Sequence, residues 1–423
     1  MTPPAAPEPV VARPPIVAYL SDVEGLWSKL ASFTEGNPHV ALDARGALSV
    51  APGAVFVFGG DAIDRGPDAR RLVAALLALK ERQPAQVVLL AGNRDINKMR
   101  LVRELDGAPP ARMPDELRTR PRGQILKWIF ANTMGARDAF ERRREELART
   151  PEAPLDDESV AESFLEDLGH GGPLRRYLAA CQLAYRSGAT MFVHGGVMPE
   201  NLGVVPGSAR RSDDVGEWIA RLNTWYDAQI EAFRQGALDE DGAPAWAPLV
   251  AYQAPLVGTR LNQASVVYAR PTDAAGNPFL PPEEVIGALA ASGVRRLVVG
   301  HTPTGDTPSI LRDERFEFVV ADNSYSPVEA GSKLFLRDDE LRAEGLTRVE
   351  GGAPEEVRCR LTRNELGSPV GKRVASSGHL VKGELSSGDF LLYRSLGNYQ
   401  VDQRVASARE LRASSLVPPR RDE

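Results

Sequence analysis

The sequence predicts a protein of the α/β class, with a layered sheet and helices packed against it. Six short apolar runs rich in β-forming residues each end in polar or glycine residues. Between several of them lie helical patterns, over Asp68–Glu81 and Asn97–Leu105. Strands that alternate with helices are typical of this class, whose ligands collect at the strand ends. The six runs are Ile16–Leu20, Val55–Phe58, Val87–Leu90, Met191–Val193, Leu297–Val299 and Phe316–Val320.

The length of the chain predicts one large domain with an appendage. Its 423 residues exceed the usual limit for a single core. Residues 1–15 are rich in proline and alanine and are expected to form a disordered tail. The main domain is expected over 16–330. Residues 331–423 are expected to form a small β-rich appendage, because short alternating runs such as Val357–Leu361 and Phe390–Tyr393 lie among Gly, Ser and Arg.

Two insertions are expected within the main domain. The first, at about 107–185, is helix-forming and carries a mixed-sign segment and an acidic run, which are interpreted as solvated helix faces and a loop. The second, at about 199–290, could cap the site or could pack as a satellite core, and the sequence leaves both possibilities open. Its aromatic residues are Trp218, Trp225, Tyr226, Trp246 and Tyr252.

Composition excludes several classes of function. A net charge of −6 argues against dedicated nucleic-acid binding, which normally requires a basic excess. Cys181 and Cys359 lie far apart, so neither a disulfide framework nor a thiolate zinc site is expected. No secretory signal and no apolar stretch of ~20 residues is present, so no membrane association is expected. A cytoplasmic location is the simplest interpretation.

Polar groups that can bind a metal or a phosphate follow five of the six runs. Each would be an ordinary turn if it stood alone, but five in this order indicate one convergent site. Residues two apart in an extended segment point the same way, so Asp22 and Glu24 are expected to face one side together. In chain order the groups are Asp22 and Glu24, then Asp61, Asp64 and Arg65, then Asn93 and Arg94, then His194, and finally His301.

This series of motifs resembles that of the calcineurin-like metallophosphoesterases. The similarity is greatest to the branch that holds the phosphoprotein phosphatases and the symmetrical diadenosine tetraphosphate hydrolases. It spans roughly residues 16–325 and rests on the motifs alone. The resemblance implies a layered β-sandwich flanked by helices. It also implies in-line attack on phosphorus by a hydroxide that bridges two metal ions.

The resemblance implies roles for particular residues. Arg65 would grip the phosphate, because its planar fork matches two phosphoryl oxygens. The family often has a second such arginine between its last two histidine motifs, and Arg260 lies in that interval. The first metal ion would be held by Asp22, Glu24 and Asp61, and the second by Asp61, Asn93, His194 and His301.

Position 24 departs from the family pattern, since the family usually has histidine there. Glutamate can still bind a metal. A set of Asp22, Glu24 and Asp61 offers only hard oxygen donors, which suit manganese or magnesium, whereas imidazole favours zinc and iron. The cofactor is therefore expected to be two divalent ions, with manganese the first choice and magnesium, iron or zinc the alternatives.

Position 94 is the second departure. Arg94 replaces a family histidine that pairs with the residue equivalent to Asp64 and helps the leaving group depart. An arginine stays protonated at physiological pH, so it cannot act as a general acid, but it can hold a developing negative charge. A two-bond bridge between Arg94 and Asp64 is expected to take the place of the Asp–His pair.

These observations predict a metal-dependent phosphohydrolase. Without a histidine at position 94, phosphoanhydrides and activated phosphomonoesters are the preferred substrates, so the expected partner is a phosphorylated small molecule or nucleotide. One alternative is a serine/threonine phosphoprotein phosphatase. Another is a catalytically silent module that binds a metal or a phospholigand.

Overall fold

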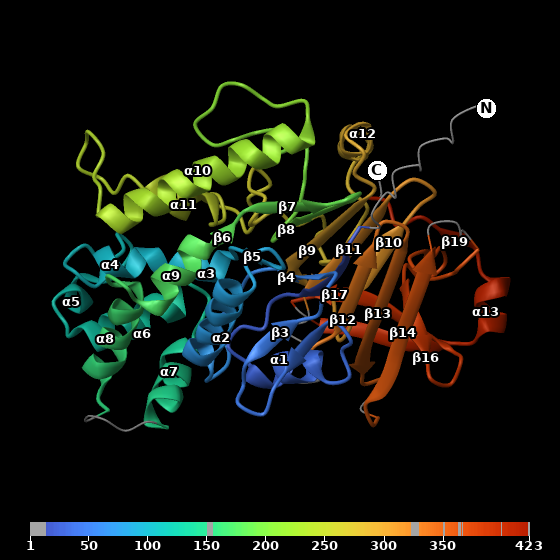
Figure 1. The fold of residues 1–423 in the computed structure, drawn as a ribbon, viewed down its shortest axis with the longest axis horizontal. Helices are drawn as coiled ribbons and strands as arrows, with labels where there is room; N and C mark the ends of the chain where they lie inside the picture. The colour runs from blue at the N-terminus through green and yellow to red at the C-terminus, as the bar shows by residue number, and fades with distance from the viewer. Residues whose placement is uncertain are drawn as a thin grey trace, which may run out of the picture.

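The computed structural model describes most of the chain, and the predicted tail falls mainly on residues 1–13, outside the described part. The described residues are 14–149, 155–322, 330–349, 352–362, 365, 367–398 and 400–421. Within them, two large sheets lie beside each other with helices at their flanks (Figure 1).

The larger sheet has twelve strands and contains the first strand of the chain near its middle. Strands β1, β4, β5 and β6 run parallel, so their carboxyl ends share one edge. In spatial order the strands are β18 (Gln400–Ala406), β17 (Phe390–Gly397), β16 (Leu380–Leu385), β14 (Glu355–Thr362), β13 (Glu340–Thr347), β12 (Lys333–Arg337), β1 (Ile16–Leu20), β4 (Ala54–Phe58), β5 (Val87–Leu90) and β6 (Cys181–Gln182), with β15 (Arg373–Val374) and β19 (Leu416–Val417) beside β16.

The smaller sheet has five strands, of which β8, β9 and β11 run parallel. Its order is β10 (Ser309–Arg312), β11 (Glu317–Asp322), β9 (Arg296–Pro303), β8 (Thr190–Val193) and β7 (Ala184–Ser187). A separate two-stranded ribbon pairs β2 (Val40–Leu42) with β3 (Leu48–Val50).

The two sheets pack face to face, because side chains along β1 alternate between two cores. Tyr19 packs against Phe192 of the smaller sheet, with ring centroids 5.9 Å apart, in the core that also holds Val298. Ala18 and Leu20 point to the opposite face and join the core beneath the helices. A strand buried on both faces is the central layer of a sandwich. The predicted α/β sandwich flanked by helices is confirmed.

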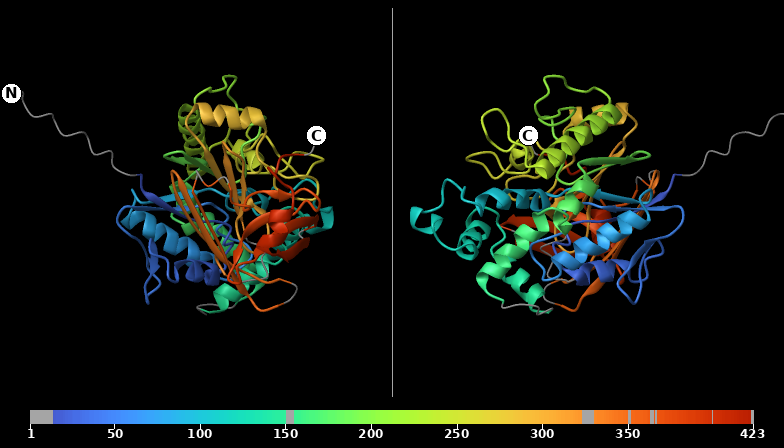
Figure 2. Two further views of the ribbon diagram at one scale, coloured as in Figure 1. Left: turned by 90° about the vertical axis from the view of Figure 1, so that its right-hand side faces the viewer. Right: turned by 60° about the vertical axis from the view of Figure 1, so that its left-hand side comes forward.

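Helices cover the outer face of the larger sheet and the region beside the smaller one (Figures 1 and 2). Helix α2 (Ala69–Arg82) is typical, since Leu72, Leu76 and Leu79 recur at helical spacing and are buried. No helix in the described ranges is long and apolar enough to cross a membrane. The other helices are α1 (Trp27–Thr34), α3 (Asn93–Asn97), η1 (Lys98–Arg100), α4 (Leu101–Glu104), α5 (Asp115–Arg118), α6 (Arg122–Asn132), α7 (Ala139–Ala148), α8 (Asp157–Leu168), α9 (Pro173–Ala180), α10 (Val215–Gln235), α11 (Ala247–Tyr252), α12 (Glu283–Ala291) and α13 (Ala408–Ala413).

The expected insertions supply helices α5–α9 and α10–α12. Not all of the charges in the first one are solvated: Arg143 of α7 is buried and pairs with Asp167 of α8 at 2.7 Å. In the second, Trp218, Tyr226 and Trp246 join the main core instead of forming a satellite core.

The C-terminal strands continue the larger sheet. Strand β12 pairs antiparallel with β1, where Leu336 lies opposite Val17. Lys382 of β16 is buried, and its Nζ donates to the carbonyl oxygens of Thr304 and Thr307, just beyond β9. The region expected to be an appendage therefore braces strands that lead to the predicted site, while the domain boundary near 330 stays a prediction.

A buried arginine of the smaller sheet pairs with a glutamate of the same sheet, hydrogen-bonds to the larger sheet and predicts a stability effect. Arg296 of β9 donates to Glu317 of β11 at 2.7 Å and to the Arg337 carbonyl of β12 at 2.8 Å. Arg296→Ala leaves a buried carboxylate unpaired, so we expect a loss of about 3–5 kcal/mol in the free energy of unfolding, measured with urea. Arg315→Ala breaks an exposed pair with Glu283 and should cost less than about 1 kcal/mol. Equal losses in the two variants would contradict this explanation.

Candidate metal centre

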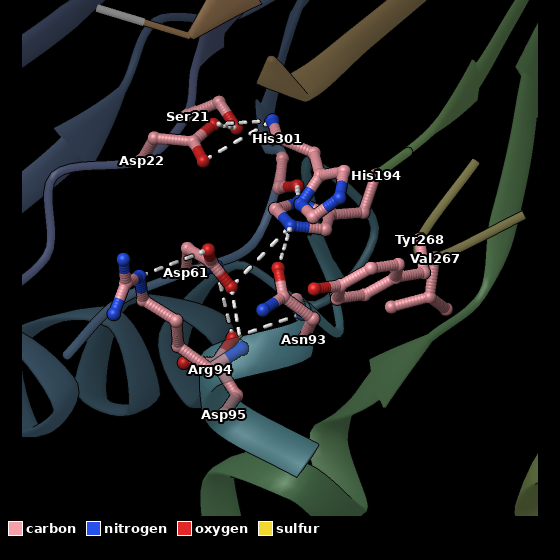
Figure 3. A network of polar contacts seen from close by, with 12 residues as sticks. Ser21, Asp22, Asp61, Asn93, Arg94, Asp95, His194, Val267, Tyr268 and His301 are labelled. Carbon is pink, nitrogen blue, oxygen red and sulfur yellow. Dashed lines mark hydrogen bonds and ion pairs between the residues drawn. The ribbon is translucent and has the colours of Figure 1, made fainter. Parts of the chain in front are cut away.

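The predicted site residues meet at one edge of the sandwich. Figure 3 shows side chains from the ends of β1, β4, β5 and β8 pointing toward one another, with His301 of β9 beside them. Asp61, His194 and His301 can place one ligand atom each within 4.8 Å of the others, and so can Asp22, Glu24 and Asp61. The two groups share Asp61, and all of these side chains are buried.

The backbone at this edge is strained. Six non-glycine residues in the described part of the chain have a positive φ, and five of them belong to the site. Left-handed backbone is costly for residues with a Cβ, and such conformations cluster at functional sites. The five are Asp22, Glu24, Asp61, Asp64 and His301.

This geometry corrects one step of the sequence reasoning. Asp22 and Glu24 were expected to face one side because an extended strand alternates. Their φ angles are 55° and 49°, so both lie in a left-handed turn after β1 has ended. The two carboxylates converge because the chain turns sharply there.

Two glycines allow the loops to approach closely. Gly60 has a φ of 100°, and a Cβ there would lie 2.8 Å from Nδ1 of His194. A Cβ at Gly92 would overlap the Asp61 carboxylate. The glycines are required because side chains and backbone of neighbouring loops fill this space.

The four residues expected to hold the second ion bring side-chain oxygen and nitrogen atoms close to one another. The Asn93 carbonyl oxygen lies 3.2 Å from Nε2 of His194, which is 3.3 Å from Asp61 Oδ1. Only by reversing its amide could Asn93 donate instead, to Nδ1 of His301 at 2.8 Å and to Asp61 at 3.2 Å. Carboxylate, amide and imidazole groups that converge in this way fit a divalent cation.

The protonation state of His194 depends on the neighbouring Asp61 carboxylate. Nδ1 of His194 lies 2.8 Å from the Gly59 carbonyl oxygen, so it carries a proton and leaves Nε2 facing the site. Burial alone would lower the pKa of His194, but the Asp61 carboxylate outweighs it and raises the pKa to about 10, so a metal ion that binds here has to displace the proton on Nε2. Burial and Arg270 lower the pKa of His301 well below its usual range, which keeps that imidazole in the neutral form that binds metals.

Burial raises the pKa of two carboxyl groups in the acidic group, which consists of Asp22, Glu24 and Asp61. Burial, together with Asp322, raises the pKa of Asp22 well above its usual range, and the Asp22 oxygens accept from the backbone N–H of His301 at 3.2 Å. Burial also raises the pKa of Glu24 to about 8, although Arg94 acts in the opposite direction.

Asp95 fixes the position of two metal-site loops. Its carboxylate accepts from the backbone N–H groups of Asp61 and Gly92 at 3.0 Å and from that of Ala62 at 2.9 Å. Burial and the neighbouring Asp61 raise the pKa of Asp95 to about 7. The loop that carries Asp61 and the loop that carries Asn93 are thereby tied together.

The two arginines near the acidic group are placed unequally. Arg65 is one-third exposed, with its Nε 3.4 Å from Glu24. Arg94 is more buried, and its Nε lies 2.9 Å from Glu24. The expected two-bond bridge from Arg94 to Asp64 is not formed: one pair of atoms is 3.5 Å apart. Lys98, fully buried on η1, contacts Asp64 more closely, at 2.7 Å.

Arg270 contacts His301, whereas the phosphate-binding role of Arg260 stays a prediction. Arg260 is exposed on the loop after α11. Arg270 donates from its Nε to Nε2 of His301 at 3.0 Å. Tyr268 accompanies it, with its ring centroid 4.8 Å from that of His301 and its hydroxyl directed toward Asn93 (Figure 3). Both residues come from the second insertion, which therefore reaches the site while its aromatic residues pack in the core.

Sequence reasoning missed further members of the site, although signals for some existed. Lys98 follows Arg94 by four residues, the spacing of one helical turn. Asp322 ends β11 just as the other acidic groups follow their strands, and it is buried. Arg270 has no such signal, because it lies in a loop whose path depends on packing.

Comparisons with known proteins return only distant structural similarity. No family model and no curated protein matches the chain. A cold-active protein-tyrosine phosphatase of a psychrophile, Shewanella sp., is 17% identical, with 82% of this chain and 80% of that chain covered and a TM-score of 0.45. A protein serine/threonine phosphatase from Saccharomyces cerevisiae with similarity to human phosphatase PP5 is 14% identical, with 82% and 84% covered and a TM-score of 0.37. Because these similarities are distant, the proposed function rests on the geometry of the site.

The Asp95 contacts predict an effect on metal affinity. In Asp95→Asn, an NH2 group must face backbone N–H donors, so the two loops should loosen. We expect Mn²⁺ affinity, measured by calorimetry, to fall by about 10–100-fold. Asp43→Asn is the matched control, since Asp43 also accepts backbone N–H groups but is exposed on the β2–β3 turn. An unchanged affinity in Asp95→Asn would show that these loops hold their positions without it.

Proposed function

We propose that this protein is a metal-dependent phosphohydrolase that acts on phosphoanhydrides or activated phosphomonoesters. The observation that carries the proposal is one cluster of candidate metal ligands with cationic side chains beside it. The donors are Asp61, Asn93, His194 and His301, and the cations are Arg65, Arg94 and Arg270. Metal ligands surrounded by arginines suit an anionic, phosphorylated substrate.

The metal site fits an ion of intermediate hardness. Its two oxygen donors suit manganese and its two imidazoles suit iron or zinc, so manganese is the first ion to test. A divalent ion bound there supplies Lewis-acid activation of a phosphoryl group and of water. The first ion implied by the resemblance would need Asp22, Glu24 and Asp61, and the guanidinium of Arg94 already lies beside Glu24 and Asp61.

The arginines would bind and orient the phosphate. Arg65 is partly exposed and contacts Glu24, and Arg270 contacts His301. Arginines placed in this way can hold phosphoryl oxygens through paired N–H donors and fix the substrate for in-line displacement. Positioning and charge stabilisation account for most of the rate in phosphoryl transfer.

The side chains that could donate a proton determine which leaving groups are preferred. Arg94 cannot donate a proton at physiological pH, and the ammonium group of Lys98 is buried against Asp64. Neither of these two cationic side chains can supply the proton, so we propose that the leaving group departs as an anion or takes its proton from water. Phosphoanhydrides and activated esters tolerate this, whereas a serine-like alkoxide does not.

Metal content and a substrate panel test the proposal. Purified protein should contain a divalent ion and hydrolyse a nucleotide polyphosphate and p-nitrophenyl phosphate faster than a phosphopeptide. Asp61→Ala should lose the ion and the activity together, because Asp61 belongs to both groups of candidate metal ligands. A phosphopeptide preference would favour the phosphoprotein phosphatase alternative. Bound metal without any turnover would favour the silent binding module.

Arg270 and Arg260 form a matched pair of variants. We expect Arg270→Ala to lower kcat/KM for p-nitrophenyl phosphate by about 10-fold or more, since a charged hydrogen bond to phosphate contributes about 1.5–3 kcal/mol. Arg260→Ala should leave both kinetic constants unchanged, because Arg260 is exposed on its loop. The assignment of Arg270 fails if the two variants behave alike.

The leaving-group argument predicts a steep dependence of rate on leaving-group pKa. For a series of aryl and alkyl phosphates, log kcat/KM should fall steadily as that pKa rises. Arg94 should stabilise the emerging charge by about 2–4 kcal/mol, so Arg94→Ala should slow all members of the series. Arg94→His should raise alkyl ester turnover selectively, because a histidine can donate a proton. A flat dependence in the wild type would mean that another residue supplies the proton.

A further inference from the structure

The three carboxylates of the acidic group can all be ionised only if a cation lies among them. Asp22, Glu24 and Asp61 lie within 4.8 Å of one another, and each is at most 2% exposed. Buried like charges at this separation cannot all ionise unless a positive group lies among them. In a two-metal site that group is the first ion.

Arg94 already provides this charge. Its Nε lies 2.9 Å from Glu24 Oε1 and 3.7 Å from Asp61 Oδ2. Its own backbone N–H donates to Asp61 Oδ1 at 2.8 Å, which fixes the start of the side chain beside the group. Arg65 contacts the other oxygen of Glu24 at 3.4 Å. Glu24 therefore lies between two guanidinium groups.

The remaining carboxylates are engaged elsewhere. Asp64 could compete for Arg94, but Lys98 pairs with it at 2.7 Å and leaves Arg94 only a 3.5 Å contact. Asp22 turns its oxygens toward the backbone N–H of His301 and the hydroxyl of Ser21. The guanidinium of Arg94 is thus directed to Glu24 and Asp61.

Both departures from the family pattern meet in this one contact. Glutamate stands at position 24 and arginine at position 94, each in place of a family histidine, and the two side chains form the closest ion pair of the acidic group. Relative to the family pattern, position 24 has gained a carboxylate and position 94 has gained a permanent positive charge, and the two charges are opposite in sign.

We propose that the guanidinium of Arg94 is the permanent cation of the group formed by Asp22, Glu24 and Asp61, so that the protein binds one divalent ion. That ion occupies the donors Asp61, Asn93, His194 and His301. The inference rests on the proposed function for its metal site but changes the number of ions and the role of Glu24. Glu24 is a partner of Arg94 and not a metal ligand.

Metal stoichiometry after saturation with Mn²⁺ and gel filtration tests this inference. Three proteins are compared: wild type, Glu24→His and Arg94→His. Glu24→His supplies the family ligand but keeps the guanidinium, whereas Arg94→His removes the guanidinium and keeps the three carboxylates. We expect one ion per chain in wild type and Glu24→His and two in Arg94→His. Electron paramagnetic resonance of the wild type should show isolated Mn²⁺, without the exchange coupling of ions ~3.5–4 Å apart.

The outcomes separate the inference from the proposed function. Two ions in the wild type, or a coupled spectrum, would overturn the inference and leave a metal-dependent phosphohydrolase intact. A single ion in folded Arg94→His would also overturn it, because the guanidinium would then not be the excluding group. No ion in any of the three proteins would contradict both. The wild-type spectrum decides the matter even if Arg94→His does not fold.

Discussion

The burial of negative charge at one edge of the sandwich is the constraint on which the rest of this structure depends. Six carboxyl groups there are buried: Asp22, Glu24, Asp61, Asp64, Asp95 and Asp322. An uncompensated buried carboxylate costs several kcal/mol, so each requires a specific partner. The chain supplies these partners in three ways: cationic side chains, backbone N–H groups and, on our proposal, a metal ion. Lys98 pairs with Asp64, and Arg94 pairs with Glu24. Three backbone N–H groups donate to Asp95.

The fold can meet this cost because the ends of its parallel strands bring several loops together. Parallel strands in each sheet bring loops to the same edge, and glycines such as Gly60 and Gly92 let those loops touch. Left-handed backbone at Asp61 and His301 then aims their side chains inward. His301 lies where the β9–β11 register shifts, a bulge that re-aims a side chain beside a site. The C-terminal strands brace this arrangement through β12 on β1 and through Lys382.

The sequence predicts the strands well and also the polar residues that follow them, because both depend on local signals, while the role of those residues as metal ligands stays a prediction. The run Val87–Leu90 is apolar, begins with two β-branched valines and is followed by Ala91 and Gly92, and it forms β5. Packing decides the rest. Asp22 and Glu24 converge through a left-handed turn, which the alternation of side chains along a strand does not describe. Arg94 contacts Glu24 because Lys98 already pairs with Asp64. Arg260 and Arg270 cannot be told apart by position in the chain, since only the loop path places one of them at His301.

Our central claim is that the side chains that converge with Asp61 form a metal site. Anomalous diffraction from crystals grown with Mn²⁺ tests this claim. The account predicts an anomalous peak bounded by Asp61, Asn93, His194 and His301, with the Asn93 carbonyl oxygen turned toward it. Density for the Arg94 guanidinium should remain between Glu24 and Asp61. The absence of a peak at these four residues, in crystals that bind Mn²⁺ elsewhere, would contradict the account.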